Sequence, residues 1–463
     1  MASISRQLAQ WAAGLRYEDL PAAVVDRAKG VTLQAMASVL IGSQNGPGKQ
    51  ALKMIADEEA GVKKGATLMV DGTLVTKGGA AYANSETALA GGKYDTFRML
   101  THPNTAIIPA ALVAAESVGA SGKAFLTGVV TGYEVMERMA AEFIPQTMSQ
   151  GFHPGPVFGI FGAAVAAAKV MGFNEEQLNS TIALCASLAS GNLESARGGG
   201  QPLREGAATR SAMLAVQLAQ GGYPSADTVL EGEAGFYHAY CGNNRGTLQY
   251  SFVGDVKADM ASITKNLGKD WMFLETLYRI YYTAGYNIAH IDVPAAICNE
   301  NNIRNEDVER IEAVVNWMET QYPSPRFPSR REDGEPQIGG TAYFTAYGVV
   351  KRGYPVTAGR RIDPKEAPPD VVEMMKRVVI IPSHKMTLFG PRFTIFTKSG
   401  KSYTRQSTGR EFIWDFDGLA KRISGIANSL PIPAAQYEQI VATCRSMENE
   451  ARADKLVKLT LKQ

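Results

Sequence analysis

Hydrophobic residues in the first 290 positions recur at the spacing of helices. Ile4, Leu8, Trp11 and Leu15 lie three or four positions apart, which predicts a helix at the start of the chain. A short interruption over Thr67–Lys77, centred on Asp-Gly, is typical of a small hairpin. The same reasoning predicts further helices over 22–40, 106–116, 122–142, from 157 onward, after the cap residue 174, and over 206–220.

The period of the pattern changes near residue 310. In Arg310–Glu319 every second residue is apolar, which is the period of a strand. Further strands are predicted at 378–382, 392–397 and 401–405, with a helix over 341–351, and helices resume over 416–428 and 434–455.

The change of period predicts a mainly α fold with an inserted α+β lid. We expect a large all-helical domain made of residues 1–276 and 411–463, and a smaller α+β domain over 277–410. A cleft between two such domains is the usual place for a ligand.

Composition and charge narrow the function classes. The 463 residues carry 47 Lys and Arg against 45 Asp and Glu, a balance that argues against bulk binding of nucleic acid or of a membrane surface. The four cysteines show no C-x-x-C spacing and no His-x-x-x-His occurs, so we expect buried reduced thiols and no metal site. With no signal-peptide pattern and no apolar run long enough to span a bilayer, the sequence predicts a soluble, cytoplasmic protein.

Three segments carry candidate chemistry. His102 stands in Thr-His-Pro, and His153 stands in a Gly/Pro turn before a predicted helix, where a ring nitrogen can face a bound anion. Arg204 follows three glycines and a Gln-Pro-Leu sequence, a pattern typical of an anion cradle. The alternatives are two structural histidines that bond backbone in turns, and a surface loop with a solvated arginine.

Taken in order, these segments resemble the MmgE/PrpD family, which includes 2-methylcitrate dehydratase, cis-aconitate decarboxylase and iminodisuccinate epimerase. The resemblance rests on Gly-Lys-Tyr-Asp-Thr at 92–96, Thr-His-Pro at 101–103, Gly-Phe-His-Pro at 151–154, Gln-Pro-Leu-Arg-Glu-Gly at 201–206 and Glu-Ala-Gly-Phe at 233–236. It implies a helical domain with a lid, a homodimer, and an inter-domain site that needs no cofactor. It also implies a small carboxylic-acid substrate on which a proton is moved alpha to a carboxylate.

The sequence departs from the family pattern at several of these positions. Gln201 replaces a lysine, Arg204 replaces a histidine, and Gly92 replaces the first aspartate. Arginine stays protonated, so an arginine cannot be the base. The resemblance and the titration range of histidine together give four catalytic candidates, His153, His102, Lys93 and Asp95. The expected substrate-binding residues are Thr96, Gln201, Arg204, Arg279 and Tyr322.

The resulting functional prediction is a carbon–oxygen lyase (hydro-lyase), decarboxylase or epimerase. Either His153 or His102 would move the proton, with Lys93 as the rival base. One alternative is an enzyme of the same fold with shifted substrate chemistry in a specialised pathway. The other is a catalytically silent dimer that binds small acids.

Overall fold

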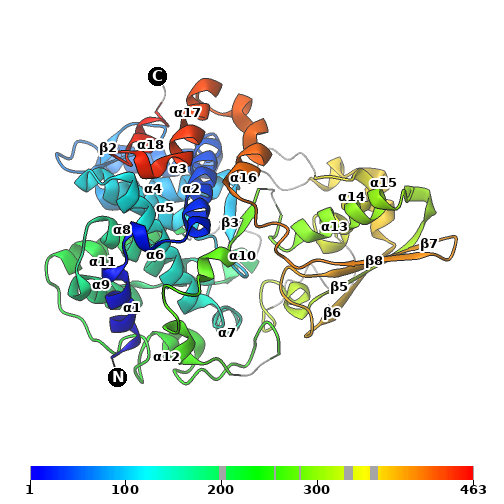
Figure 1. Ribbon diagram of the computed structural model, residues 1–463, viewed down its shortest axis with the longest axis horizontal. Coiled ribbons are helices and arrows are strands. Elements are labelled where there is room, and N and C mark those ends of the chain that lie inside the picture. Colours follow the sequence, from blue (N-terminus) through cyan, green and yellow to red (C-terminus); the bar gives the residue numbers. More distant parts are fainter. Residues whose placement is uncertain are drawn as a thin grey trace.

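Helices make up most of the molecule, and a four-stranded sheet lies at one end of it (Figure 1). The computed structural model describes residues 2–197, 205–254, 257–280, 283–327, 337–354 and 363–461. The prediction of a mainly α fold with a smaller α+β part is confirmed.

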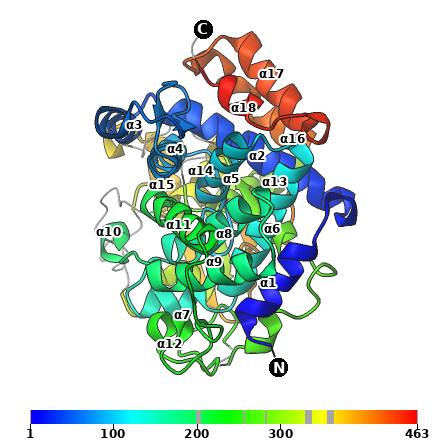
Figure 2. The same ribbon diagram turned by 90° about the vertical axis from the view of Figure 1, so that its left-hand side faces the viewer.

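The helical part is built around α8 (Pro154–Val170), which packs against α5, α6, α9 and α11. Almost all of α8 is buried, because its many Ala and Gly residues let neighbouring helices approach on every side. At Gly162 a Cβ would lie only 2.8 Å from the side chain of Ile107 on α5. The helices of this part are α1 (Ile4–Gly14), α2 (Ala22–Gly42), α3 (Gly46–Glu59), α4 (Lys77–Gly91), α5 (Asn104–Val118), α6 (Gly122–Ala140), α7 (Ile144–Ser149), α9 (Glu175–Leu188), α10 (Glu194–Arg197), α11 (Glu205–Gln220) and α12 (Phe236–Cys241), as Figure 2 shows from the side.

Two small sheets lie within the helical part. The predicted hairpin is confirmed as β1 (Ala66–Thr67) paired antiparallel with β2 (Leu74–Val75). A second pair, β3 (Tyr94–Thr96) with β4 (Leu277–Arg279), was not predicted from the sequence. This second pair connects segments more than 180 residues apart.

The α+β part contains the sheet β6-β5-β7-β8 with helices on it. β5 (Val308–Asn316) pairs parallel with β6 (Val378–Ser383) and antiparallel with β7 (Arg392–Thr397), which pairs with β8 (Ser402–Gln406). Burial alternates along β7, so one face meets the helices, as the period of two predicts. Those helices are α13 (Asn287–Glu300), α14 (Thr341–Lys351) and α15 (Pro369–Met375).

After the sheet the chain returns to the helical part. α16 (Phe416–Ile423) and α17 (Ala434–Arg445) both pack against α2. The prediction of one helix over 434–455 is wrong. α17 ends at Arg445, a short 3-10 helix spans Met447–Asn449, the backbone of residues 450 and 453 bonds to the start of α6 and the loop before it, and α18 (Lys455–Lys458) follows. The domain boundaries at 276/277 and 410/411 stay a prediction.

Two expectations about chemistry and solubility can be compared with the structure. The thiols Cys185, Cys241, Cys298 and Cys444 are all buried and free, as expected, and burial raises the pKa of the Cys241 thiol to about 12. Within the described ranges, no helix combines the length and the apolar character that crossing a bilayer requires.

Candidate active site

The pairing of β3 with β4 places several predicted site residues together. Tyr94 stands opposite Arg279 in the register, and the Arg279 guanidinium carbon lies 4.5 Å from the centre of the Tyr94 ring. A guanidinium over an aromatic face is an attractive arrangement. Beside it, Lys93 Nζ donates to the carbonyl of Ile280 at 2.5 Å. Lys93, Asp95, Thr96 and Arg279 therefore share one small region.

His102 lies in the turn between β3 and α5, and it is buried. Its Nδ1 is 2.9 Å from the main-chain carbonyl oxygen of Asp95, and its ring centre is 4.3 Å from that of Tyr94. A carbonyl oxygen can only accept a hydrogen bond, so Nδ1 carries a proton, and in neutral His102 the lone pair is on Nε2. This tautomer leaves His102 Nε2 able to take a proton.

The Asp95 carboxylate holds the same turn. Its two oxygens accept from the backbone N–H of Asn104 at 3.0 and 3.2 Å, and Oδ2 also accepts from the Tyr133 hydroxyl at 2.5 Å. Burial raises the pKa of Asp95 to about 7, although the hydrogen bonds from Tyr133 and Asn104 work in the opposite direction. Asp95 therefore touches the His102 turn through both its main chain and its side chain.

His153 is fully buried at the N-terminus of α8. Its Nδ1 accepts a hydrogen bond from the backbone N–H of Gly155 at 3.1 Å. Since an amide N–H can only donate, Nδ1 carries the lone pair and Nε2 carries the proton in neutral His153. A Cβ at Gly155 would lie 2.7 Å from Glu205 Oε1, 2.9 Å from the Leu100 carbonyl oxygen and 3.0 Å from His153 Cε1. The loop that carries His102 thus packs against the turn that carries His153.

Thr96 and Tyr322 lie where the helical part meets the α+β part. Thr96 contacts Gly285, where a Cβ would be 2.7 Å from the Thr96 methyl and 3.5 Å from Phe389 of the α+β part. The next residue, Tyr286, has its ring centre 6.4 Å from that of Tyr322. Tyr322 is thereby connected to the β3 segment through two intervening residues.

A second contact between the two parts lies beside His153. Arg326 Nη1 donates to the Ser149 carbonyl at 3.4 Å, and the Phe327 ring lies 3.7 Å from where a Cβ of Gly151 would stand. The segment after Tyr322 therefore borders the turn that precedes α8.

Lys93 and Arg279 differ from ordinary surface cations in their burial and in their closeness to each other. Burial lowers the pKa of the Lys93 amine, and the neighbouring charge of Arg279 lowers it further. Arg279 is buried, and its Nε has no hydrogen-bond partner among the described residues. A buried guanidinium donor of this kind suits a bound carboxylate.

Two of the predicted substrate-binding residues, Gln201 and Arg204, lie outside the described residues. Three residues that contact the predicted ones were not expected from the sequence: Tyr94, Asn104 and Tyr133. A weak signal existed for Tyr133, since Glu134 and Glu137 beside it are acidic residues on a helix rich in apolar residues. The functional roles of all the site residues stay predictions.

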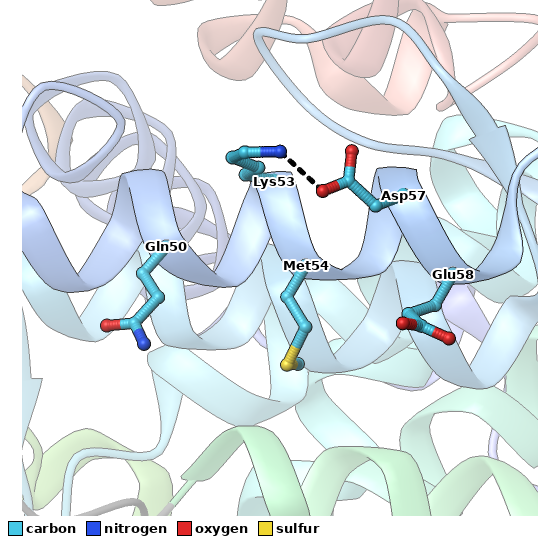
Figure 3. A pocket seen from close by; sticks show the side chains of 5 residues that line it. All are labelled: Gln50, Lys53, Met54, Asp57 and Glu58. Carbon is cyan, nitrogen blue, oxygen red and sulfur yellow. Dashed lines mark hydrogen bonds and ion pairs between the residues drawn. The ribbon is translucent and has the colours of Figure 1, made fainter.

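Surface hollows occur elsewhere on the molecule. One, of about 290 Å³, runs along α3 and is lined by Gln50, Lys53, Met54, Asp57 and Glu58 (Figure 3). All five side chains come from a single helix, and Lys53 and Asp57 pair with each other at 2.5 Å. We therefore place the candidate site at the β3–β4 cluster, where groups from distant segments converge. No group of three metal-ligating side chains occurs within the described ranges.

The fold is a large helical part with a smaller α+β part, and the β3–β4 region brings together a histidine, a carboxylate and two cationic side chains. Residues 6–249 match the MmgE/PrpD N-terminal domain, and this match covers more than half of the chain. The chain belongs to the MmgE/PrpD family.

Several curated proteins are similar to the chain. The cis-aconitate decarboxylase-like protein oryM of Aspergillus oryzae is 26% identical over 302 residues, which cover 61% of this chain and 59% of that protein. Cis-aconitate decarboxylase of Aspergillus terreus is 26% identical over 239 residues, 49% of this chain and 48% of that protein. The Homo sapiens enzyme of the same name is 32% identical over 148 residues, 31% of each. The chain thus spans less than two thirds of the length of each of these relatives.

Proposed function

We propose that the protein is a cofactor-independent lyase or isomerase that acts on a small di- or tricarboxylic acid or a related acid. The observation that carries this proposal is the complementary state of two buried histidines. In the neutral imidazoles, His102 has its lone pair on Nε2 and His153 has its proton on Nε2. One imidazole can therefore act as a base and the other as an acid near neutral pH.

In the proposed reaction His102 Nε2 removes a proton from the carbon alpha to a carboxylate. The electron pair of the C–H bond moves into that carboxylate and forms an enediolate, whose charge Arg279 stabilises. In dehydration His153 protonates the departing hydroxyl. In epimerisation it returns a proton to the opposite face of the carbon. Decarboxylation needs no such abstraction: the C–C bond to CO₂ breaks, its electron pair stays on the carbon, and His153 protonates that carbon.

Arg279 is the proposed anchor for a substrate carboxylate, with Arg204 as a second one. Support for Arg279 comes from its burial and from an Nε that lacks a partner among the described residues. Lys93 is the rival base, because burial and Arg279 lower the pKa of its amine. Thr96, Gln201 and Tyr322 complete the proposed binding surface.

The names of the relatives make decarboxylation the first reaction to test. We also propose, on the family resemblance, that the protein works as a homodimer in the cytoplasm. The specialised-pathway alternative predicts activity on an acid other than cis-aconitate.

The test is a panel of small di- and tricarboxylic acids, cis-aconitate among them, incubated with purified protein in chelator without added cofactor. Products are followed by proton NMR. Conversion of at least one acid is the expected result. Binding of an acid without any conversion would instead support the silent dimer, and activity only after a cofactor is added would contradict cofactor independence.

A further inference from the structure

A tyrosine on α6, Tyr133, contacts the Asp95 carboxylate that holds the His102 turn. Tyr133 is fully buried, and its hydroxyl donates to Asp95 Oδ2 at 2.5 Å. Its ring packs against Phe273, with ring centres 4.3 Å apart. The phenol is therefore held between a rigid helix and an aromatic side chain, with its hydroxyl directed at the carboxylate.

We propose that Tyr133 is a positioning residue: it holds the Asp95 carboxylate and, through Asp95, fixes the orientation of His102. The inference rests on the proposed function in one respect, the assignment of His102 as the base. The connection runs through three contacts already described. Tyr133 binds the Asp95 carboxylate, this carboxylate binds the Asn104 N–H, and the Asp95 carbonyl accepts from His102 Nδ1.

These contacts hold the turn that carries His102 at two places, at His102 itself and at Asn104. Asn104 follows His102 by two residues, and Asn104 Oδ1 returns a bond by accepting from the Asp95 N–H at 3.3 Å. A movement of the Asp95 carboxylate therefore moves the turn on which the imidazole stands. Because the Asp95 carbonyl fixes which nitrogen of His102 is protonated, the same movement also changes which nitrogen can accept a proton.

The charged and titratable groups that face Asp95 come from several elements. Tyr133 and Glu137 come from α6, Arg27 from α2, Tyr278 from β4, and His102 from the turn before α5. Burial raises the pKa of Glu137 well above its ordinary value. The Glu137 carboxyl accepts a hydrogen bond from the Thr276 hydroxyl. Among the described side chains, Tyr133 is the one that donates a hydrogen bond to the Asp95 carboxylate.

The test compares Tyr133→Phe with the wild-type protein and with Tyr237→Phe. Tyr237 is a matched control, because it is equally buried and its hydroxyl donates to the Met139 carbonyl at 3.0 Å, away from Asp95. Both variants lose one buried hydroxyl, so a purely structural effect should be similar in the two. Only Tyr133→Phe should change the tautomer of His102.

The first readout is the tautomer of His102, measured by NMR on ¹⁵N-histidine-labelled protein. Five histidines give few signals, and His102→Gln assigns the one of interest. We expect the Nδ1-protonated form in the wild-type protein and in Tyr237→Phe, and a mixture of tautomers in Tyr133→Phe. This readout needs no substrate, so it decides the inference even if the proposed activity fails.

The second readout is the pH profile of kcat on an acid that the protein converts. Loss of the Tyr133 bond removes a contact that favours ionised Asp95, so the acidic limb should move up by about one pH unit. Because the pKa of Asp95 is about 7, kcat at pH 7 should then fall about fivefold. In an Asp95→Asn background the same substitution should add no further change. Asp95→Asn alone should remove the contribution of Asp95 to the limb and leave that of His102, which keeps the test valid if Tyr133→Phe does not fold.

An unchanged His102 tautomer and pH profile in folded Tyr133→Phe would overturn the inference. Equal changes in Tyr237→Phe would also overturn it, because they would show a general effect of losing a buried hydroxyl.

Discussion

Asp95→Asn should change how the stability of the protein depends on pH. The pKa of Asp95 is about 7 in the folded protein, against an ordinary value of 3.8. Between these values the folded state holds a proton that the unfolded chain has released. The protonated carboxyl therefore favours the folded state at low pH, and this contribution is lost as the pH rises through 7. Linkage gives a loss of about 2.5 kcal/mol between pH 5 and pH 8 for this one group.

An amide at position 95 keeps the shape of the side chain and cannot ionise. The free energy of unfolding of the wild-type protein should therefore fall by about 2.5 kcal/mol more than that of the variant between pH 5 and pH 8. Urea unfolding followed by tryptophan fluorescence at several pH values measures this difference. The raised pKa of Glu134 affects both proteins alike, whereas the charge of Asp95 contributes to the raised pKa of Glu137, so the comparison reports on Asp95 together with its coupling to Glu137. A wild-type minus variant difference that does not change with pH would refute the reasoning.

Two further substitutions test the site. Gly155→Ala should lower kcat at least tenfold and destabilise the protein by about 1–3 kcal/mol, because its Cβ would meet the Leu100 carbonyl oxygen at 2.9 Å and press on His153. Gly159→Ala on the same helix is the control, since its Cβ would meet nothing nearer than 3.9 Å. Steady-state kinetics and thermal unfolding measure both variants. Equal losses of kcat and of stability in the two would argue against a specific contact at Gly155. Arg279→Gln should raise KM about tenfold or more with a smaller effect on kcat, and Arg279→Lys should recover part of it; an unchanged KM in both would remove Arg279 from substrate binding.

Local patterns in the sequence were sufficient to predict much of the fold. Helical spacing located α2 and α5, and the period of two located β5 and β7, because these elements bury one face against their neighbours. The end of α17 could not be read in this way. The helix ends at Arg445, and the chain after it bonds through residues 450 and 453 to the start of α6 and the loop before it; a distant contact of that kind leaves no local pattern.

The candidate site was only partly accessible to sequence reasoning. His102 and His153 were found because a histidine beside a turn is an uncommon local feature. The β3–β4 pairing was missed, since three residues are too few to show a period and the partner strand is remote. Tyr133 was missed for a related reason: its partner, Asp95, comes from another element, and a tyrosine in an apolar helix is usually core.

The most direct test of the account is the turnover number of His102→Gln and His153→Gln on an acid that the protein converts. The exposed His238 provides a matched control as His238→Gln. The account predicts that each of the first two substitutions lowers kcat by about 10² or more, while the control keeps wild-type turnover. If both variants keep near-wild-type turnover and Lys93→Met abolishes it, the histidines are not the acid–base pair and the lysine is the base.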